Sequence, residues 1–201
     1  ASFPLFWDQQ FHSPVMLMLA LVVFLACLFA ALGVGVLGAW SDIRGLTIPN
    51  SYSLIIMGSF LAAYIILWPL GRADSVFMGL FSHLLAALGV FGVTVALFAL
   101  KVMGAGDSKL ATAYALWIGL GSGLMAFIFY MALAGGLLGL VSLALKKWRP
   151  VKNPAAGGWV ASVQAGQSKV PYGVAILCGA LASFVKLGYL GPEIFSRLIQ
   201  P

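Results

Sequence analysis

Hydrophobic residues run along this chain in long uncharged stretches, with short polar breaks between them. A helix needs about 20 apolar residues to cross the hydrocarbon core of a bilayer. The stretches predict helices over approximately 14–40, 51–68, 76–100, 107–120, 124–145 and 171–190. The pattern therefore predicts an all-α polytopic membrane protein, built as a bundle of about six transmembrane helices.

The fourth stretch, 107–120, is shorter than the others. Its roughly 14 residues would make a helix of about 21 Å, whereas the hydrocarbon core is about 30 Å thick. We therefore expect the preceding loop, MGAGD, to dip into the membrane. Residues 146–170 are rich in Lys, Pro, Gly, Ser and Gln, which predicts a flexible cytoplasmic loop. Residues 1–201 are expected to form a single domain.

Composition excludes several classes of protein. Hydrophobic residues make up 62% of the chain, charged residues 8%, and the mean hydropathy is +1.06. A water-soluble domain of this size would lack the polar surface to cover itself. The net charge of +6 does not indicate nucleic-acid binding, because cations in a membrane protein belong to its loops. Cys27 and Cys178 form no CxxC pair, so no metal site and no cofactor are expected.

The cations predict the orientation of the chain. If the N-terminus lies outside, the outer segments hold only Arg72, Lys186 and Arg197. The inner loops then hold eight cations: Arg44, Lys101, Lys109, Lys146, Lys147, Arg149, Lys152 and Lys169. This imbalance fits the positive-inside rule. Both termini are therefore expected outside, in a multi-pass protein of the inner (cytoplasmic) membrane.

The same orientation sorts the five acidic residues. Three of them fall on the outer side, and only Asp42 and Asp107 fall on the cytoplasmic side, each near a helix end. Taken alone, Asp107 would be read as a helix N-cap and Asp42 as part of a solvated loop. Together they predict two carboxylates that meet at one membrane face.

Two carboxylates that share a site do not both ionise easily. The ionised one can take a proton from water as the water attacks a peptide carbonyl. The protonated one can stabilise the developing oxyanion and then protonate the leaving amine. Because Asp107 begins a helix and Asp42 ends one, the helix dipoles favour Asp107 as the base.

Three segments resemble the type IV prepilin peptidases, a family of intramembrane aspartyl proteases with a GxGD signature. They are GAGDSKL (104–110), SDIRGLTIPN (41–50) and KVPYGVAI (169–176). The resemblance implies that Asp42 and Asp107 are the catalytic pair and that they act at the cytoplasmic side. The substrate it implies is the basic leader peptide of type IV pilin-like precursors.

Further residues are expected to shape the loops or bind substrate, and Gly104 and Gly106 are expected to let the backbone approach another segment closely. The full set is Gly104, Gly106, Lys109, Pro49, Asn50, Pro171 and Tyr172. For Lys109, contact with lipid headgroups is favoured over contact with substrate. Expected partners are pilin-like precursors, membrane lipids and pilus or secretion assembly proteins, and no nucleic acid.

The chain lacks the cytosolic insertion with paired CxxC motifs that larger, bifunctional family members carry. It therefore resembles the minimal peptidases of the tight-adherence (Flp pilus) branch, and N-methyltransferase activity is not expected. Three alternatives stay open at this point: an archaeal-type preflagellin peptidase, another GxGD protease that cuts membrane proteins within the bilayer, and a non-enzymatic membrane component of a secretion or pilus machine.

Overall fold

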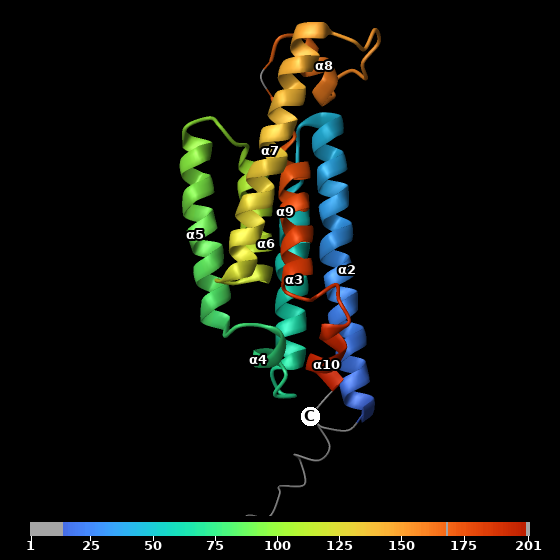
Figure 1. Cartoon of the computed structure of the whole chain (residues 1–201), viewed down its shortest axis with the longest axis vertical. Coiled ribbons are helices and arrows are strands. Elements are labelled where there is room, and N and C mark those ends of the chain that lie inside the picture. The colour runs from blue at the N-terminus through green and yellow to red at the C-terminus, as the bar shows by residue number, and fades with distance from the viewer. Residues whose placement is uncertain (1–13, 168, 200–201) are drawn as a thin grey trace, which may run out of the picture.

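A computed structural model of the chain describes residues 14–167 and 169–199 (Figure 1). These residues form helices and contain no strand. The helices are α2 (Pro14–Gly45), α3 (Asn50–Leu67), α4 (Ala73–Val76), α5 (Leu80–Ala99), α6 (Ala105–Ile118), α7 (Ser122–Trp148), α8 (Trp159–Gln164), α9 (Tyr172–Lys186) and α10 (Glu193–Ile199). The prediction of an all-α fold is confirmed.

Four of the described helices, α2, α3, α5 and α7, are long and apolar enough to cross a membrane. The other two predicted spans correspond to α6, with 14 residues, and α9, with 15. Both are shorter than the roughly 20 residues that a hydrocarbon core requires. The structure thus supports four spanning helices, and a total of about six stays a prediction.

Three segments differ from the sequence-based expectation. Helix α2 continues five residues past Trp40 to Gly45, so Asp42 lies within its last turn. The third predicted helix, 76–100, begins later than expected, at Leu80 in α5, and the separate short helix α4 ends at Val76. The loop over 146–170 is partly ordered, because α8 packs on α7 and α2. The Trp159 indole in α8 donates hydrogen bonds to Ser142 Oγ (3.2 Å) and to the Lys169 carbonyl (3.0 Å).

Helix α6 is the most buried element of the bundle. It packs against α3, α5, α7 and α9, and most of its side chains are excluded from solvent. Its polar groups find partners there: the Tyr114 hydroxyl donates to the Ala31 carbonyl (2.9 Å) and the Trp117 indole to the Ile56 carbonyl (2.9 Å). Because buried polar groups are costly when unpaired, these bonds fix α6 against α2 and α3.

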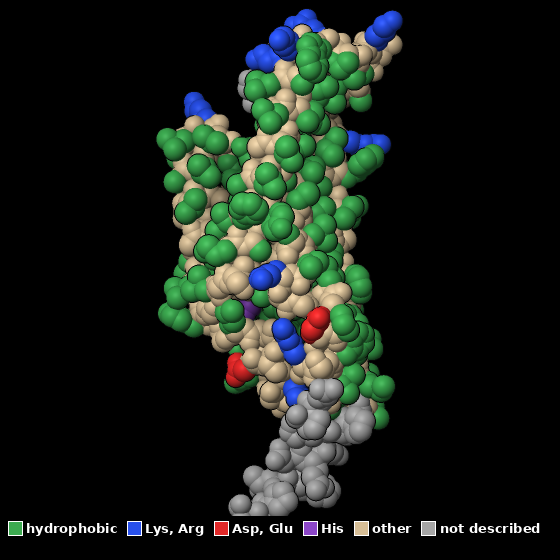
Figure 2. All heavy atoms as spheres, viewed as in Figure 1, with side chains coloured by type: hydrophobic (Ala, Val, Ile, Leu, Met, Phe, Trp, Pro, Cys, Tyr) green, Lys and Arg blue, Asp and Glu red, His purple; other side chains and the backbone are tan. Residues whose placement is uncertain are grey.

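The outer surface matches a bilayer environment. Large hydrophobic side chains are exposed along α2, α3, α5 and α7, and Figure 2 shows them covering the flank of the bundle. Many Lys and Arg side chains gather at the end that carries the loops after α2, α5 and α7, whereas the acidic side chains visible in this view lie toward the opposite end, beside the remaining Lys and Arg (Figure 2). This separation agrees with the loop charges on which the predicted orientation rests, although the orientation itself stays a prediction.

Gly35 in α2 lets α6 approach closely. A Cβ at this position would overlap the Tyr114 hydroxyl, whereas a Cβ at Gly33, two residues earlier, would meet nothing within 4 Å. Tyr114 is fully buried and cannot swing into solvent. The glycine at position 35 is therefore needed for packing, and the glycine at 33 is not.

We predict that Gly35→Ala destabilises the bundle by about 1–3 kcal/mol, because the added methyl group overpacks the core and breaks the hydrogen bond from Tyr114 to Ala31. Thermal unfolding of the purified protein in detergent measures this. Gly33→Ala is the matched control, and its melting temperature should equal or exceed that of the wild type, since alanine favours a helix over glycine. Equal melting temperatures for the two variants would contradict the packing described here.

Candidate active site

Asp42 lies in the last turn of α2 with its carboxylate turned inward. Only 5% of the residue is exposed. Its Oδ2 accepts a hydrogen bond of 2.7 Å from the backbone N–H of Gly173, in the first turn of α9. A helix N-terminus carries partial positive charge, so α9 stabilises the ionised form of this carboxylate.

Gly173 permits this contact because it has no side chain. A Cβ there would lie 3.1 Å from the Asp42 Oδ2 and 3.2 Å from the Ile48 Cδ1. Both distances are tighter than ordinary van der Waals contact. A larger residue at 173 would therefore push the start of α9 away from the Asp42 carboxylate.

Asp107 is the third residue of α6 and caps its own helix. Its Oδ2 accepts a hydrogen bond of 3.0 Å from the backbone N–H of Gly104, the N-cap residue. A Cβ on Gly104 would lie only 2.8 Å from that oxygen. The capping role and the inward position of the side chain, which is 9% exposed, thus occur together.

Gly106 brings the start of α6 against the loop that follows α2. A Cβ on Gly106 would lie 3.1 Å from the Ile48 Cβ and 3.2 Å from the Ile48 carbonyl oxygen. Ile48 belongs to the connection between α2 and α3, six residues after Asp42. The glycine therefore sets the separation between the two segments that carry the acids.

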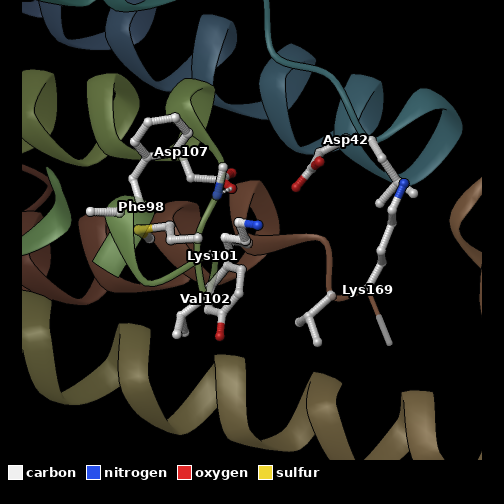
Figure 3. A pocket seen from close by; sticks show the side chains of 12 residues that line it. Asp42, Phe98, Lys101, Val102, Asp107 and Lys169 are labelled. Atoms are coloured by element: carbon white, nitrogen blue, oxygen red, sulfur yellow. Dashed lines mark hydrogen bonds between the residues drawn. The ribbon is translucent and has the colours of Figure 1, made fainter. Parts of the chain in front are cut away.

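The two acids line one open cavity of about 690 Å³. Figure 3 shows their carboxylates pointing toward one another from opposite walls of this cavity. They also line a smaller neighbouring cavity of about 230 Å³, together with Thr47, Ile48 and Gly106. The structure thus brings together the two acids that the sequence analysis paired.

Burial and the neighbouring charge control the protonation of Asp107, which lies outside the four candidate membrane spans. Burial raises its pKa, the Asp42 carboxylate raises it further, and the Gly104 N–H lowers it in part, for a resulting pKa of about 7. Desolvation disfavours a charged carboxylate and a like charge adds to that effect. Asp107 therefore holds a proton for much of the time near neutral pH.

The other residues expected at the site divide into two groups. Gly104 and Tyr172 line the large cavity, and Gly106 lines the smaller one. Pro49 and Pro171 are the N-cap residues of α3 and α9 and line neither. Lys109 is outside both cavities as well, and its Nζ donates a 2.8 Å hydrogen bond to the Asn50 Oδ1.

Sequence reasoning missed three residues of the site. Lys101 and Lys169 line the large cavity, although they were counted only as loop cations. Lys101 has a φ of 59°, which is uncommon for a non-glycine residue and marks the tight turn between α5 and α6. Gly173 stands in the segment KVPYGVAI, so the motif itself held the signal for the third.

The described residues contain no group of three His, Cys, Asp or Glu side chains placed to hold a metal ion. The residues that face the large cavity offer two carboxylates, two ammonium groups and a phenol for chemistry. This set suits general acid–base catalysis on a substrate that enters from the open side.

A family model described as the type IV leader peptidase family matches residues 29–140, which include both Asp42 and Asp107. No curated protein and no solved structure matches the chain.

We predict that Asp107→Asn stabilises the folded protein at pH 8 but not near pH 4. The wild-type carboxyl has a folded pKa of about 7 against an ordinary value of 3.8. The free energy of unfolding that the protonated carboxyl contributes is therefore fully present below the ordinary value and is lost as the pH rises through the folded pKa. An amide has no such titration. The gain should grow between pH 4 and 8, and each unit of pKa shift corresponds to about 1.4 kcal/mol before discounting for solvent screening.

Thermal unfolding in detergent from pH 4 to 8 measures this difference. Asp74→Asn, at an exposed position on α4, controls for the loss of a carboxylate as such. A pH-independent difference between Asp107→Asn and the wild type would show that Asp107 is not held protonated in the folded state.

Proposed function

This chain belongs to the type IV leader peptidase family, and we propose that it is an aspartyl endopeptidase in which Asp42 and Asp107 act as one acid–base pair. The observation that carries the proposal is the pair of buried carboxylates directed at each other across one open cavity. Burying two acids side by side costs stability. Such an arrangement is typical of a catalytic site.

The surroundings of each acid support a division of roles. Burial disfavours the charged form of Asp42 too, but the Gly173 N–H at the positive end of α9 offsets part of that cost. Asp107 holds a proton near neutral pH because of its burial and the Asp42 charge. We therefore assign the base to Asp42 and the acid to Asp107. This reverses the expectation from helix dipoles alone, since at Asp107 burial and the Asp42 charge together outweigh the dipole of α6.

The reaction follows from these roles. Asp42 takes a proton from water as the water oxygen bonds to the peptide carbonyl carbon, and Asp107 stabilises the oxyanion that forms. The C–N bond then breaks as its nitrogen takes a proton from the pair. The pair gains one proton from water and gives one to the amine, so it ends the cycle with the single proton it had at the start.

The proposed substrate is a type IV pilin-like precursor, cut after its leader peptide. The family description supports a leader peptide as the target. The cations gathered near the cavity end support cleavage at the cytoplasmic face of the inner membrane, by the positive-inside rule. The released pilin would pass to pilus or secretion assembly proteins.

Peptidase activity without N-methylation is part of the same proposal. The bifunctional family members carry paired CxxC motifs, and this sequence has none. Its two cysteines, Cys27 and Cys178, are both free and belong to different helices, α2 and α9. A non-enzymatic role explains the site less well, because it gives no reason to bury two carboxylates against one another.

We predict that Asp42→Asn and Asp107→Asn each lower the rate of precursor cleavage at least about 100-fold, since each removes one half of the acid–base function. Co-expression with a pilin-like precursor, followed by separation of precursor and mature forms, measures this effect. Purified protein with a precursor peptide gives the rate.

Asp74→Asn is the matched control, because Asp74 is exposed on α4 at the opposite end of the bundle. It should process precursor at the wild-type rate. If either Asp42→Asn or Asp107→Asn cleaves at the rate of this control while remaining folded, the aspartyl mechanism is wrong.

We also predict that Gly106→Ala lowers the cleavage rate by about 3- to 10-fold, because its methyl group pushes Ile48 and shifts the two acid-bearing segments slightly apart. The substrate affinity should change less than the rate. Gly58→Ala on α3 is the control, since a Cβ there meets nothing within 4 Å. Equal rates for the two variants would show that the contact at Ile48 does not set the site geometry.

A further inference from the structure

A groove on the outside of the bundle has no part in the site described above. Its volume is about 400 Å³, within the range of about 300–1,000 Å³ that is typical of ligand pockets. It lies over α6 and is bounded by α3 and α5. The residues that line it are Asn50, Ser53, Leu54, Met57, Phe91, Lys109 and Thr112.

The floor of the groove is a face of α6 that the neighbouring helices leave uncovered. Most of α6 is buried, but Lys109 is exposed and Thr112 is half-buried, three residues further along the same face. The walls are apolar and face outward: Leu54 on α3 is 67% exposed and Phe91 on α5 is 45% exposed. In a bilayer, such a groove opens to lipid.

One end of the groove is polar and positively charged. The Lys109 Nζ donates to the Asn50 Oδ1, at the first residue of α3. Asn50 is neutral, so this contact does not compensate the positive charge. An ammonium group has three N–H donors, and the bond to Asn50 uses one of them.

A second polar group lies in the same wall. Ser53 is 4% exposed, and its hydroxyl has no hydrogen-bond partner among the described residues. A buried hydroxyl without a partner is costly, and such groups are expected where a bound molecule completes their hydrogen bonding. Lys109, Asn50 and Ser53 together form the polar end of this groove.

We propose that the groove binds one anionic phospholipid from the surrounding bilayer. The headgroup phosphate accepts hydrogen bonds from Lys109 and from the Asn50 amide, and an acyl chain lies against Leu54, Met57 and Phe91. Charge complementarity decides the occupant, since Lys109 attracts a phosphate and repels a basic peptide segment. This inference does not rest on the proposed peptidase function.

The bound lipid has a consequence for the neighbouring site. Asn50 follows Ile48 by two residues, and Lys109 follows Asp107 by two residues. A phosphate held between Asn50 and Lys109 braces the start of α3 against the start of α6. It thereby supports the contact between Ile48 and Gly106 that sets the spacing of the acids.

Native mass spectrometry of the full chain in detergent, titrated with phosphatidylglycerol or phosphatidylcholine, tests the proposal. The wild type should bind one phosphatidylglycerol in preference to phosphatidylcholine. Lys109→Met should weaken phosphatidylglycerol binding about tenfold or more, the effect of losing a charge-assisted hydrogen bond. Lys109→Arg should keep the preference, which separates loss of charge from loss of fold.

Lys152→Met is the matched control, because it removes one exposed positive charge from the loop between α7 and α8. It should bind phosphatidylglycerol as the wild type does. Equal weakening by Lys109→Met and Lys152→Met would overturn the site, since only general electrostatic attraction would then remain. A photo-crosslinker at Leu54 that captures a pilin-like precursor in place of lipid would also overturn it.

Discussion

The close contact between Gly106 and Ile48 is the constraint on which the site depends. Asp42 belongs to α2 and Asp107 to α6, and the two elements meet near the acids through the loop that carries Ile48. A Cβ at 106 would lie 3.1 Å from the Ile48 Cβ and 3.2 Å from the Ile48 carbonyl oxygen, so Ile48 would have to move away by a few tenths of an ångström. Such a shift changes the spacing of two carboxylates that must act on the same water and carbonyl. Gly106 is needed because it allows this short distance to Ile48. Its backbone conformation does not require glycine, since its φ is not in the left-handed region.

The bundle stabilises the two acids as far as their chemistry allows. Each carboxylate accepts one backbone N–H, from Gly173 for Asp42 and from Gly104 for Asp107. These bonds offset part of the desolvation cost, yet the Asp107 pKa stays near 7. The packing of α6 offsets the remaining desolvation cost. In it, the Tyr114 hydroxyl donates to a carbonyl of α2 and the Trp117 indole donates to a carbonyl of α3. Stability in the interior of the bundle thus permits an unfavourable pair of groups at one end.

Much of this could be predicted from the sequence, because its signals are local. The apolar stretches located the main helices, and the charge of the loops singled out Asp42 and Asp107 as the acids at one face. The position of Asp42 within α2 was not predicted, since 41–45 reads as a polar turn. The helix continues there because Ser41 Oγ donates to the Thr47 carbonyl and Gly173 holds the Asp42 carboxylate.

The remaining features depend on contacts between distant residues. Gly173 and Asp42 are 131 positions apart in the sequence, and no local sequence pattern predicts a contact between such distant residues. Lys101 and Lys169 reach the cavity only because the loop between α5 and α6 and the segment before α9 converge there. Helix α8 is held in place by hydrogen bonds from the Trp159 indole to Ser142 and Lys169. It was not predicted, because a segment rich in Gly, Pro and Ser is typical of a flexible loop.

The pH dependence of kcat/KM for cleavage of a pilin-like precursor tests the central claim most directly, that two coupled carboxylates form one acid–base site. The account predicts a bell-shaped profile. Activity falls at high pH as Asp107 loses its proton, with the alkaline limb near its pKa of about 7, and falls at low pH as Asp42 gains one. A rate that stays constant from pH 5 to pH 9 would contradict it.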